Sequence, residues 1–313
     1  EQRCQWAREL KMGKGRETVY PTYGEIFQAA LGEPQSEPGE TPAAYPAEKK
    51  YLIVDEFQYV VRAGEEFMRE LLAFLHDGRR RSQVLVILCS SSIGWVENSM
   101  VNRMGEAAAE ISGFLKVREL GFEHVREFFP DFSRRQCVET YAILGGVPGF
   151  WSHFDGRLST KDNICRHILD RKAFLYGEGQ RIVAEELREM SVYNTILAAI
   201  ASGRRKLNDL YLHTEFSRAK ISVYLKNLME LELVEKVFSY DTEGKANTQK
   251  GVYRISNHFV HFYFTYLYPN LGSLERMDAE EFYKEYIAPT LNLYVANYFS
   301  LVCKQLFERW NKE

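Results

Sequence analysis

Two adjacent carboxylates follow an apolar run in the segment YLIVDEFQYV, residues 51–60. The run predicts a buried strand, and Asp55 and Glu56 stand where it ends. Hydrolysis of a nucleoside triphosphate needs one acid at the C-terminal end of such a strand to hold Mg²⁺, usually through water, and a second acid to orient the attacking water. By position, Asp55 fits the first role and Glu56 the second. A plain solvated strand end is the alternative for the same residues.

Three hydroxyls end the next apolar run, VLVILCSSS at residues 84–92. Ligands of open α/β sheets bind at the carboxyl ends of the strands, so Ser90, Ser91 and Ser92 are expected to face the same crevice as the two acids. A hydroxyl there can sense a γ-phosphate or position a water. A polar exit from strand to loop is the simpler alternative.

The elements around these residues predict an α/β fold. A helix is expected over 23–31, a solvated loop over 33–49, strands at 51–55 and 84–88, and an amphipathic helix over 64–77 between them. Continuous apolar strands separated by a helix are typical of a parallel sheet covered on both faces. The sequence therefore predicts a parallel sheet in this part of the chain.

Helical patterns dominate after residue 119. They include FEHVREFF, RRQCVETYAIL, a break at GGVPG, and KDNICRHILDRKAFL. From about residue 188, three helical segments precede two strands around a polar turn, which is the element order of a winged helix-turn-helix. An aromatic run, HFVHFYFTYLYPN, and a last helix over about 291–311 follow.

These motifs together resemble the archaeal-type P-loop ATPases of the STAND branch of AAA+. The resemblance rests on YLIVDEFQYV as Walker B, LVILCSSSIGWVEN as sensor 1, YAILGGVPGFW in a helical lid, SRAKISVYLKNLMELELVEKV in the winged helix, and YRISNHFVHFYFTYLYPN beyond it. It implies an α/β P-loop NTPase core with an AAA+-like parallel sheet at 1–119 and a helical lid at 120–187. A winged helix-turn-helix at 188–257 and a partial C-terminal helical segment at 258–313 would follow.

The resemblance also implies ATP and Mg²⁺ as ligands and gives the residues roles. Asp55 would hold Mg²⁺ through water, Glu56 would activate water, and Ser91 would act as sensor 1, with Gln58, Ser90 and Ser92 lining the site. In the lid, a turn near the nucleotide would contain Gly145, Gly146 and Pro148, for which a plain helix-breaking turn is an equally good interpretation. No arginine finger can be assigned, and Arg103 is a nearby candidate with a surface position as its alternative.

The phosphate-binding half of such a site is missing from the sequence. The pattern G-x-x-x-x-G-K-S/T does not occur: MGKGR at 12–16 lacks the hydroxyl and a preceding strand, and EGKAN at 243–247 falls in the predicted wing. In the family the P-loop precedes Walker B, so we expect it N-terminal to Glu1. Without backbone N–H groups and a lysine around the phosphates, the acids complete a nucleotide site but do not form one alone.

Basic residues on SRAKISVYLKNLMELEL, the second element of the predicted helix-turn-helix, suit double-stranded DNA. Phosphate and groove contacts are expected from Arg218, Lys220, Ser222 and Lys226, and backbone contacts from Arg204 and Arg205. The alternative is an ordinary amphipathic helix in a winged helix that packs as an intramolecular clamp on the ATPase.

Other features favour structural interpretations. The aromatic run is more simply a buried interdomain helix than a base-stacking platform. His258 and His261 lie one helical turn apart without a further ligand for a metal. The family continues into a nuclease-like domain, but Ser300 stands where its first helix carries a glutamate, and the residues up to Glu313 include no metal-binding Asp and Glu-x-Lys strand.

Composition narrows the class of protein. The net charge is −3 and the pI about 6.3, so no global basic field attracts nucleic acid or an anionic membrane. Five scattered cysteines predict neither disulfides nor zinc, and no apolar stretch approaches the length of a membrane helix, so a cytoplasmic protein without membrane contact is expected. The leading hypothesis is an ATP-hydrolysing STAND-type ATPase whose nucleotide state positions its winged helix. A DNA-binding or regulatory protein with a non-catalytic scaffold is the alternative, and a defence-associated or toxin-like protein that binds a protein partner is a third.

Overall fold

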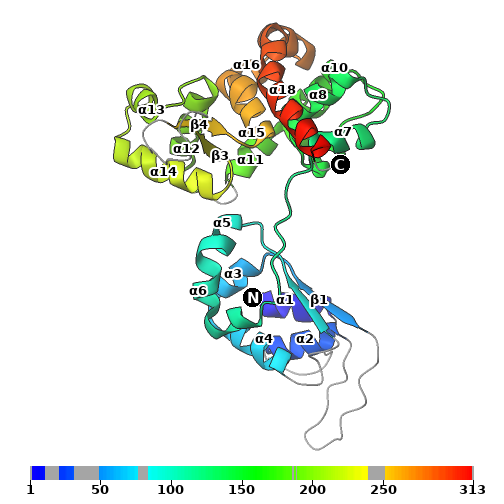
Figure 1. Cartoon of the computed structure of the whole chain (residues 1–313), viewed down its shortest axis with the longest axis vertical. Coiled ribbons are helices and arrows are strands. Elements are labelled where there is room, and N and C mark those ends of the chain that lie inside the picture. The colour runs from blue at the N-terminus through cyan, green and yellow to red at the C-terminus, as the bar shows by residue number, and fades with distance from the viewer. Residues whose placement is uncertain are drawn as a thin grey trace, which may run out of the picture. The chain divides into compact units, whose positions relative to one another are not determined.

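The computed structural model describes residues 2–10, 21–31, 49–76, 84–184, 187, 189–238 and 251–311. The chain divides into two compact units, unit 1 at Glu1–Leu115 and unit 2 at Lys116–Glu313 (Figure 1). Most of the predicted loop at 33–49 and the segments MGKGR and EGKAN lie outside the described residues. No helix in the described ranges is long and apolar enough to span a bilayer.

Unit 1 consists of short helices around a pair of strands. Its described elements are α1 (Gln2–Glu9), α2 (Tyr23–Ala30), β1 (Lys50–Val54), α3 (Phe57–Ala63), α4 (Glu66–His76), β2 (Val84–Leu88), α5 (Ile93–Trp95), the π-helical η1 (Val96–Met100), α6 (Val101–Met104) and the 3₁₀-helical η2 (Gly105–Glu110). Its core contains Leu52 and Val54 of β1 and an aromatic group in which Phe27 of α2 meets Phe67 and Phe74 of α4 at 5.8 and 5.4 Å between ring centroids. The two apolar runs and the helix between them therefore build this core from one side of the strands.

The predicted P-loop ATPase sheet is wrong for the described residues. β1 and β2 are parallel, with Lys50 opposite Val84 and Val54 opposite Leu88, but among the described residues they form a sheet of only two strands. Helices of unit 1 gather on one side of this pair (Figure 1). On the other face Tyr51, Ile53, Leu85 and Ile87 are exposed, whereas a sheet in a doubly wound α/β fold is covered on both faces. The described chain is mostly helical, with two separate two-stranded sheets.

In its described part, unit 2 is a helical assembly with one small antiparallel sheet. Its described elements up to the sheet are α7 (Phe122–Phe128), α8 (Arg134–Leu144), α9 (Pro148–Trp151), α10 (Thr160–Ile164), η3 (Cys165–Leu169), η4 (Phe174–Tyr176), α11 (Glu178–Ala184), α12 (Met190–Ala201), α13 (Leu207–Thr214), α14 (Arg218–Glu230), β3 (Val234–Val237) and β4 (Val252–Ile255). After the sheet come α15 (His258–Phe262), η6 (Tyr263–Leu267), η7 (Tyr268–Asn270), α16 (Leu271–Leu274), α17 (Ala279–Phe282), η8 (Tyr283–Ile287) and α18 (Ala288–Trp310).

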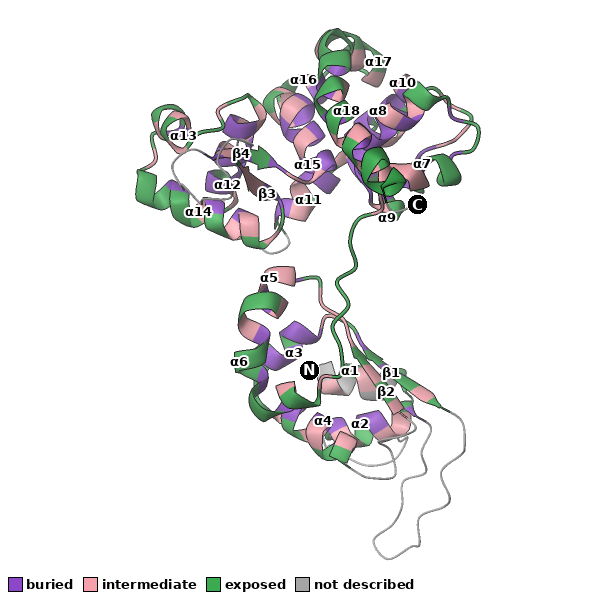
Figure 2. Ribbon diagram, in the orientation of Figure 1, coloured by how far each residue is buried: buried purple, intermediate pink, exposed green. Residues whose placement is uncertain are grey.

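One continuous core holds unit 2 together. It runs from Val125 of α7 to Val302 of α18 and includes the fully buried Trp151 and Phe259. Figure 2 shows α8 and α15 largely buried, as expected for helices at the centre of the unit. The indole of Trp151 donates to the carbonyl of Gly145 at 2.8 Å, which ties the GGVPG break to this core.

Three helices and an antiparallel pair occur in the order expected of a winged helix. These are α12, α13, α14 and the strands β3 and β4, with Val234 opposite Ile255. Ser217 caps α14, because its hydroxyl accepts the Lys220 N–H at 3.2 Å. The connection between the strands, where the wing was predicted, lies outside the described residues.

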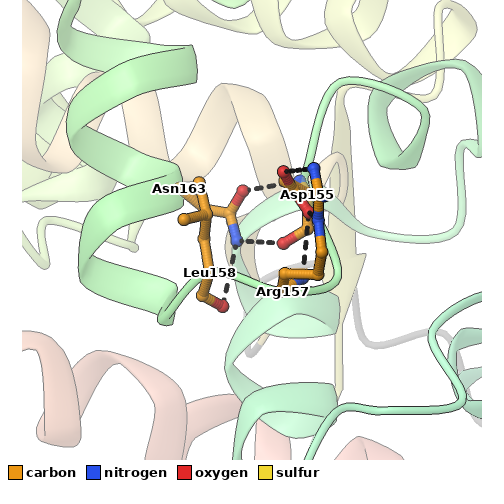
Figure 3. A network of polar contacts seen from close by, with 4 residues as sticks. All are labelled: Asp155, Arg157, Leu158 and Asn163. Atoms are coloured by element: carbon orange, nitrogen blue, oxygen red, sulfur yellow. Dashed lines mark hydrogen bonds and ion pairs between the residues drawn. The ribbon is translucent and has the colours of Figure 1, made fainter.

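A polar network fixes the loop before α10 (Figure 3). The buried Asn163 side chain accepts the Asp155 N–H at 2.7 Å and donates to the carbonyls of Asp155 and Leu158 at 3.0 and 3.5 Å. Arg157 donates to both carboxylate oxygens of Asp155, and these hydrogen bonds lower the pKa of that carboxyl to about 2. The loop is thus held by its own backbone and by a charge pair.

Candidate functional site

The ends of β1 and β2 bring the predicted site residues of unit 1 together. The backbone N–H of Cys89 donates to the Val54 carbonyl at 2.9 Å, and the Phe57 N–H donates to the Cys89 carbonyl at 3.0 Å. The segments that follow β1 and β2 therefore leave the sheet at the same edge. Glu56 begins α3 there in a left-handed backbone conformation, with φ 49° and ψ 39°. A non-glycine residue adopts this conformation only at a cost, so the position is held by its surroundings.

Those surroundings converge on one carboxylate oxygen. The hydroxyl of Ser91 donates to Glu56 Oε2 at 2.8 Å, and the Ser91 backbone N–H lies 3.3 Å from the same atom. The Gln58 amide also donates to Oε2 and lies 3.5 Å from the Ser91 hydroxyl. Three donors, one from the first turn of α3 and two from the segment after β2, thus hold Glu56, while within the described part of the chain its other oxygen, Oε1, is left open.

This arrangement keeps Glu56 ionised. Partial burial raises the pKa of the carboxyl, and the hydrogen bonds from Gln58 and Ser91 more than offset that effect, so the pKa lies below its ordinary value. Glu56 is therefore a carboxylate at neutral pH, fixed in position and able to accept a hydrogen bond through Oε1.

Asp55 differs from its neighbour because it is exposed. Its Oδ1 accepts the backbone N–H of Glu56 at 3.0 Å, which orients the side chain and leaves Oδ2 open among the described contacts. The described residues contain no group of three or more His, Cys, Asp or Glu side chains that could hold a metal. A single carboxylate still fits Mg²⁺, which keeps several waters and takes one or two carboxylates together with substrate phosphates.

Gln58 carries an unpaired polar atom in the same place. The side chain is fully buried, its Nε2 binds Glu56, and its Oε1 has no hydrogen-bond partner among the described residues. The amide cannot be reversed, because its carbonyl would then face the Glu56 carboxylate. A buried carbonyl of this kind is usually paired with a water or a ligand donor.

The three serines do different things. Ser91 binds Glu56, the Ser90 hydroxyl accepts the Ser92 N–H at 3.2 Å, and the Ser92 hydroxyl lies 3.5 Å from the Arg62 guanidinium. Ser92 is buried, so the last two contacts stabilise the turn. Of the three serines, only Ser91 forms a hydrogen bond with one of the two acids, Glu56.

Arg62 is a cation of this region that sequence reasoning missed. It lies over the Trp95 ring at 5.6 Å and reaches Ser92. The sequence could have revealed Arg62 through its spacing from Gln58. The two residues are four apart on α3, so they share a face of that helix. Arg103, by contrast, is an exposed residue of α6 without a contact to the acids.

Comparison with known proteins leaves the family open. The chain is 28% identical over 273 residues to an uncharacterized protein of Methanocaldococcus jannaschii, in a match that covers 84% of this chain and 58% of the relative. This chain thus spans less than two thirds of the relative's length. No family model matches the chain. No solved structure matches it either.

The basic residues predicted to contact DNA lie on the exposed outer side of α14 and next to β4. Arg218, Ser222 and Lys226 follow one another at four-residue spacing on α14, whose outer side is exposed (Figure 2). Lys220 is exposed as well, and its ammonium lies 4.9 Å from the Phe216 ring.

Several of these basic residues already have interaction partners within the protein. The Arg218 guanidinium donates to Asn208 at 2.7 Å and lies over the Tyr211 ring at 4.1 Å, and Lys226 pairs with Glu230 at 3.7 Å. Arg204 donates to the Ser202 hydroxyl at 2.7 Å, and the Arg205 carbonyl accepts the Tyr253 N–H at 2.7 Å. Aromatic rings under cations keep the side chains extended along the surface.

The remaining candidates have structural roles. Gly145 has φ 68° and ends α8, Gly146 follows it, and Pro148 begins α9, so the GGVPG segment is a turn between two helices. His258 Nδ1 lies 2.7 Å from the Tyr141 carbonyl, and His261 Nδ1 lies 2.6 Å from the Tyr298 hydroxyl. Both histidines are thus engaged in the core of unit 2.

Proposed function

We propose that the acidic strand ends of unit 1 form the carboxylate side of a Mg²⁺-dependent site that hydrolyses ATP. The observation that carries this proposal is the convergence of Ser91 and Gln58 on Oε2 of Glu56. A solvated strand end has no reason to hold a charged side chain with three donors in a costly backbone conformation. Such pre-organisation is typical of a group that must keep its position during a reaction.

The two acids have separate tasks in this proposal. Asp55 is exposed, and its open Oδ2 would face a hydrated Mg²⁺, which supplies positive charge to the phosphates when bound. Glu56 is the water-orienting base: its low pKa keeps it ionised, and Oε1 accepts a hydrogen bond from the attacking water. Ser91 and Gln58 are positioning residues because they act through Glu56.

Replacement of the acids tests the proposal. In the full-length protein, Glu56→Gln is expected to lower the turnover number for ATP by about 100-fold or more while ATP still binds, because the water loses its base. Asp55→Asn is expected to raise the Mg²⁺ concentration needed for half-maximal activity. Phosphate release and equilibrium binding of a fluorescent ATP analogue measure the two effects.

Glu65→Gln is the matched control, because Glu65 is an exposed acid of the same unit outside the strand ends. Its turnover should equal that of the unchanged protein. The proposal fails if the full-length protein does not bind ATP with Mg²⁺, or if Glu56→Gln hydrolyses ATP as fast as the control.

A second candidate function, binding of duplex DNA, is favoured by the exposed row on α14. Arg218, Ser222 and Lys226 are aligned on one side of a helix that follows a helix and a turn, which is how a recognition helix presents side chains to a major groove. In this interpretation the cations contact phosphates and fix the helix on the duplex.

Salt dependence separates this function from the first. Arg218→Gln combined with Lys220→Gln should weaken binding to a DNA duplex and lower the slope of log K against log salt by roughly 1 for each phosphate that the variant no longer neutralises. Lys304→Gln, on the exposed side of α18, should leave both the affinity and the slope unchanged. If Lys304→Gln weakened DNA binding as much as the double variant does, the effect would come from net charge alone. A DNA site on α14 would then be rejected.

A further inference from the structure

An exposed apolar row runs along the last three turns of α18. Phe299, Leu306, Phe307 and Trp310 are 55%, 42%, 61% and 73% exposed, and the half-buried Cys303 lies between them. Their spacing of three and four residues places them on one side of the helix. The rings of Phe307 and Trp310 touch edge to face at 6.1 Å. We call these five residues the α18 stripe.

The opposite side of α18 is already occupied, so the helix cannot turn the stripe inward. Tyr294, Tyr298 and Val302 are buried in the core of unit 2. Gln305 donates to the Tyr141 hydroxyl at 2.8 Å and accepts the Phe122 N–H at 2.9 Å. The orientation of α18 is therefore fixed by packing and by hydrogen bonds on its inner side.

The size of the stripe is that of an interface. Fully burying an aromatic side chain removes about 150–250 Å² from water, so three aromatics and a leucine exposed to this extent present on the order of 500 Å². That equals the largest apolar patch of a typical monomer. Two such patches facing each other would bury about 1,000 Å², the lower bound for a specific protein interface.

Charge argues against a nucleic acid or a strongly charged peptide as the occupant. The stripe itself contains no ionisable group other than Cys303, and beside it Lys304 and Glu308 pair with each other at 3.7 Å. With the exposed Arg309, these residues amount to two cations and one anion, too small a charge excess to attract a polyanion or to repel a second copy of the same helix.

We propose that the α18 stripe pairs with the α18 stripe of a second copy of this chain. In an antiparallel two-fold arrangement centred on Cys303, Phe299 lies opposite the second copy's Phe307, and the large Trp310 lies opposite the small, exposed Ala296. In this register two phenylalanines meet on either side of Cys303, and the tryptophan near each helix end meets a small residue, so the side chains can interdigitate as ridges and grooves. Antiparallel helix dipoles also attract, and a closed two-fold contact uses the whole patch on both copies.

The oligomeric state tests the pairing. Sedimentation equilibrium over roughly 1 to 100 µM should show a monomer–dimer equilibrium, and Phe307→Glu should raise its dissociation constant about 10-fold or more. Leu293→Glu is the matched control, since Leu293 is 69% exposed on the same helix but lies off the stripe. It should dimerise like the unchanged chain. Far-UV circular dichroism establishes that both variants are folded.

Cross-linking gives a second readout that depends on the register. A short bis-maleimide should join two copies through Cys303, and Cys303→Ser should abolish the covalent dimer. A monomer throughout the concentration range, a dimer insensitive to Phe307→Glu, or a cross-link that survives Cys303→Ser would overturn the proposal. So would a monomeric full-length protein in which Trp310 is shielded from an aqueous quencher, because another segment would then cover the stripe.

Discussion

Gly146 is a position where one methyl group decides stability. A Cβ atom added there would lie 2.0 Å from the carbonyl oxygen of Leu120, and the Leu120 N–H donates to the Gly146 carbonyl at 2.8 Å. The two backbones touch, so neither can move aside without breaking this contact. Gly146→Ala is therefore expected to lower the free energy of unfolding by roughly 2–4 kcal/mol, measured by denaturant titration.

Gly149 provides the comparison for this substitution. It lies in α9, three residues away, and an added Cβ would meet nothing within 4 Å. Gly149→Ala is expected to be neutral or to stabilise by up to about 1 kcal/mol, since alanine is the better helix former. If both variants lost the same stability, close backbone approach at Gly146 would not be the cause.

Single residues of the site were predictable where their type and their place at a strand end were enough. Asp55, Glu56 and Ser91 follow apolar runs, and parallel pairing brings them together. The roles of Ser90 and Ser92 were not predictable, because consecutive residues point in different directions when they leave a strand. The unpaired Oε1 of Gln58 depends on which atoms its amide meets, which a sequence does not record.

At the scale of elements, alternation hidden within an apolar run explains the wrong sheet prediction. Every residue of YLIV is apolar, so the sequence predicts burial on both faces, yet Leu52 and Val54 are buried while Tyr51 and Ile53 are exposed. Helices were easier to predict, because their three-to-four-residue spacing is visible even when they are short. The aromatic run at 258–270 is buried helix, in line with its simpler interpretation.

Two histidines of α15, His258 and His261, should make the stability of unit 2 sensitive to acid. Burial lowers the pKa of His258 to about 4, although its hydrogen bond to the Tyr141 carbonyl works in the opposite direction. For His261, burial and then the charge of Arg205 lower the pKa to about 4. Both side chains are thus neutral in the folded protein at neutral pH.

The sign of the pH effect follows from these values. An unfolded histidine takes up a proton as the pH falls below about 6.5, whereas the folded one does so only near pH 4, so stability decreases between these limits. The loss is on the order of 3 kcal/mol for His258. Chemical unfolding from pH 7 to pH 4 should show this decrease, with a flatter profile in His258→Gln. Exposed His213 is the control: a flattening of equal size in His213→Gln would contradict the assignment.

At the scale of the whole molecule, separate cores predict separate unfolding events. Leu71 belongs to the core of unit 1 and Leu225 to the core of unit 2, and both are almost fully buried. Leu71→Ala and Leu225→Ala should each cost about 2–5 kcal/mol, but in different calorimetric transitions. In the double variant the two losses should add within about 0.5 kcal/mol. A single transition that both substitutions shift together would show that the units unfold as one.

The sequence predicts a domain boundary near residue 119, where strand patterns stop, and this assignment stays a prediction; the two compact units divide at Leu115 and Lys116. The inner boundaries at 187 and 257 remain predictions. Ile143, Leu225 and Phe259 come from the three predicted segments on either side of these boundaries and lie in one core. Sequence patterns mark where an element type changes, but they do not show which elements share a core.

At Glu56, the left-handed backbone conformation favours glycine, whereas the proposed activity requires the carboxylate. Glycine would relieve a conformational cost of order 1 kcal/mol there, yet it would also remove the carboxylate that Ser91 and Gln58 hold. A selection for thermal stability alone should therefore enrich Glu56→Gly, whereas a selection for turnover should eliminate it. A library randomised at this codon would separate the two demands in one experiment.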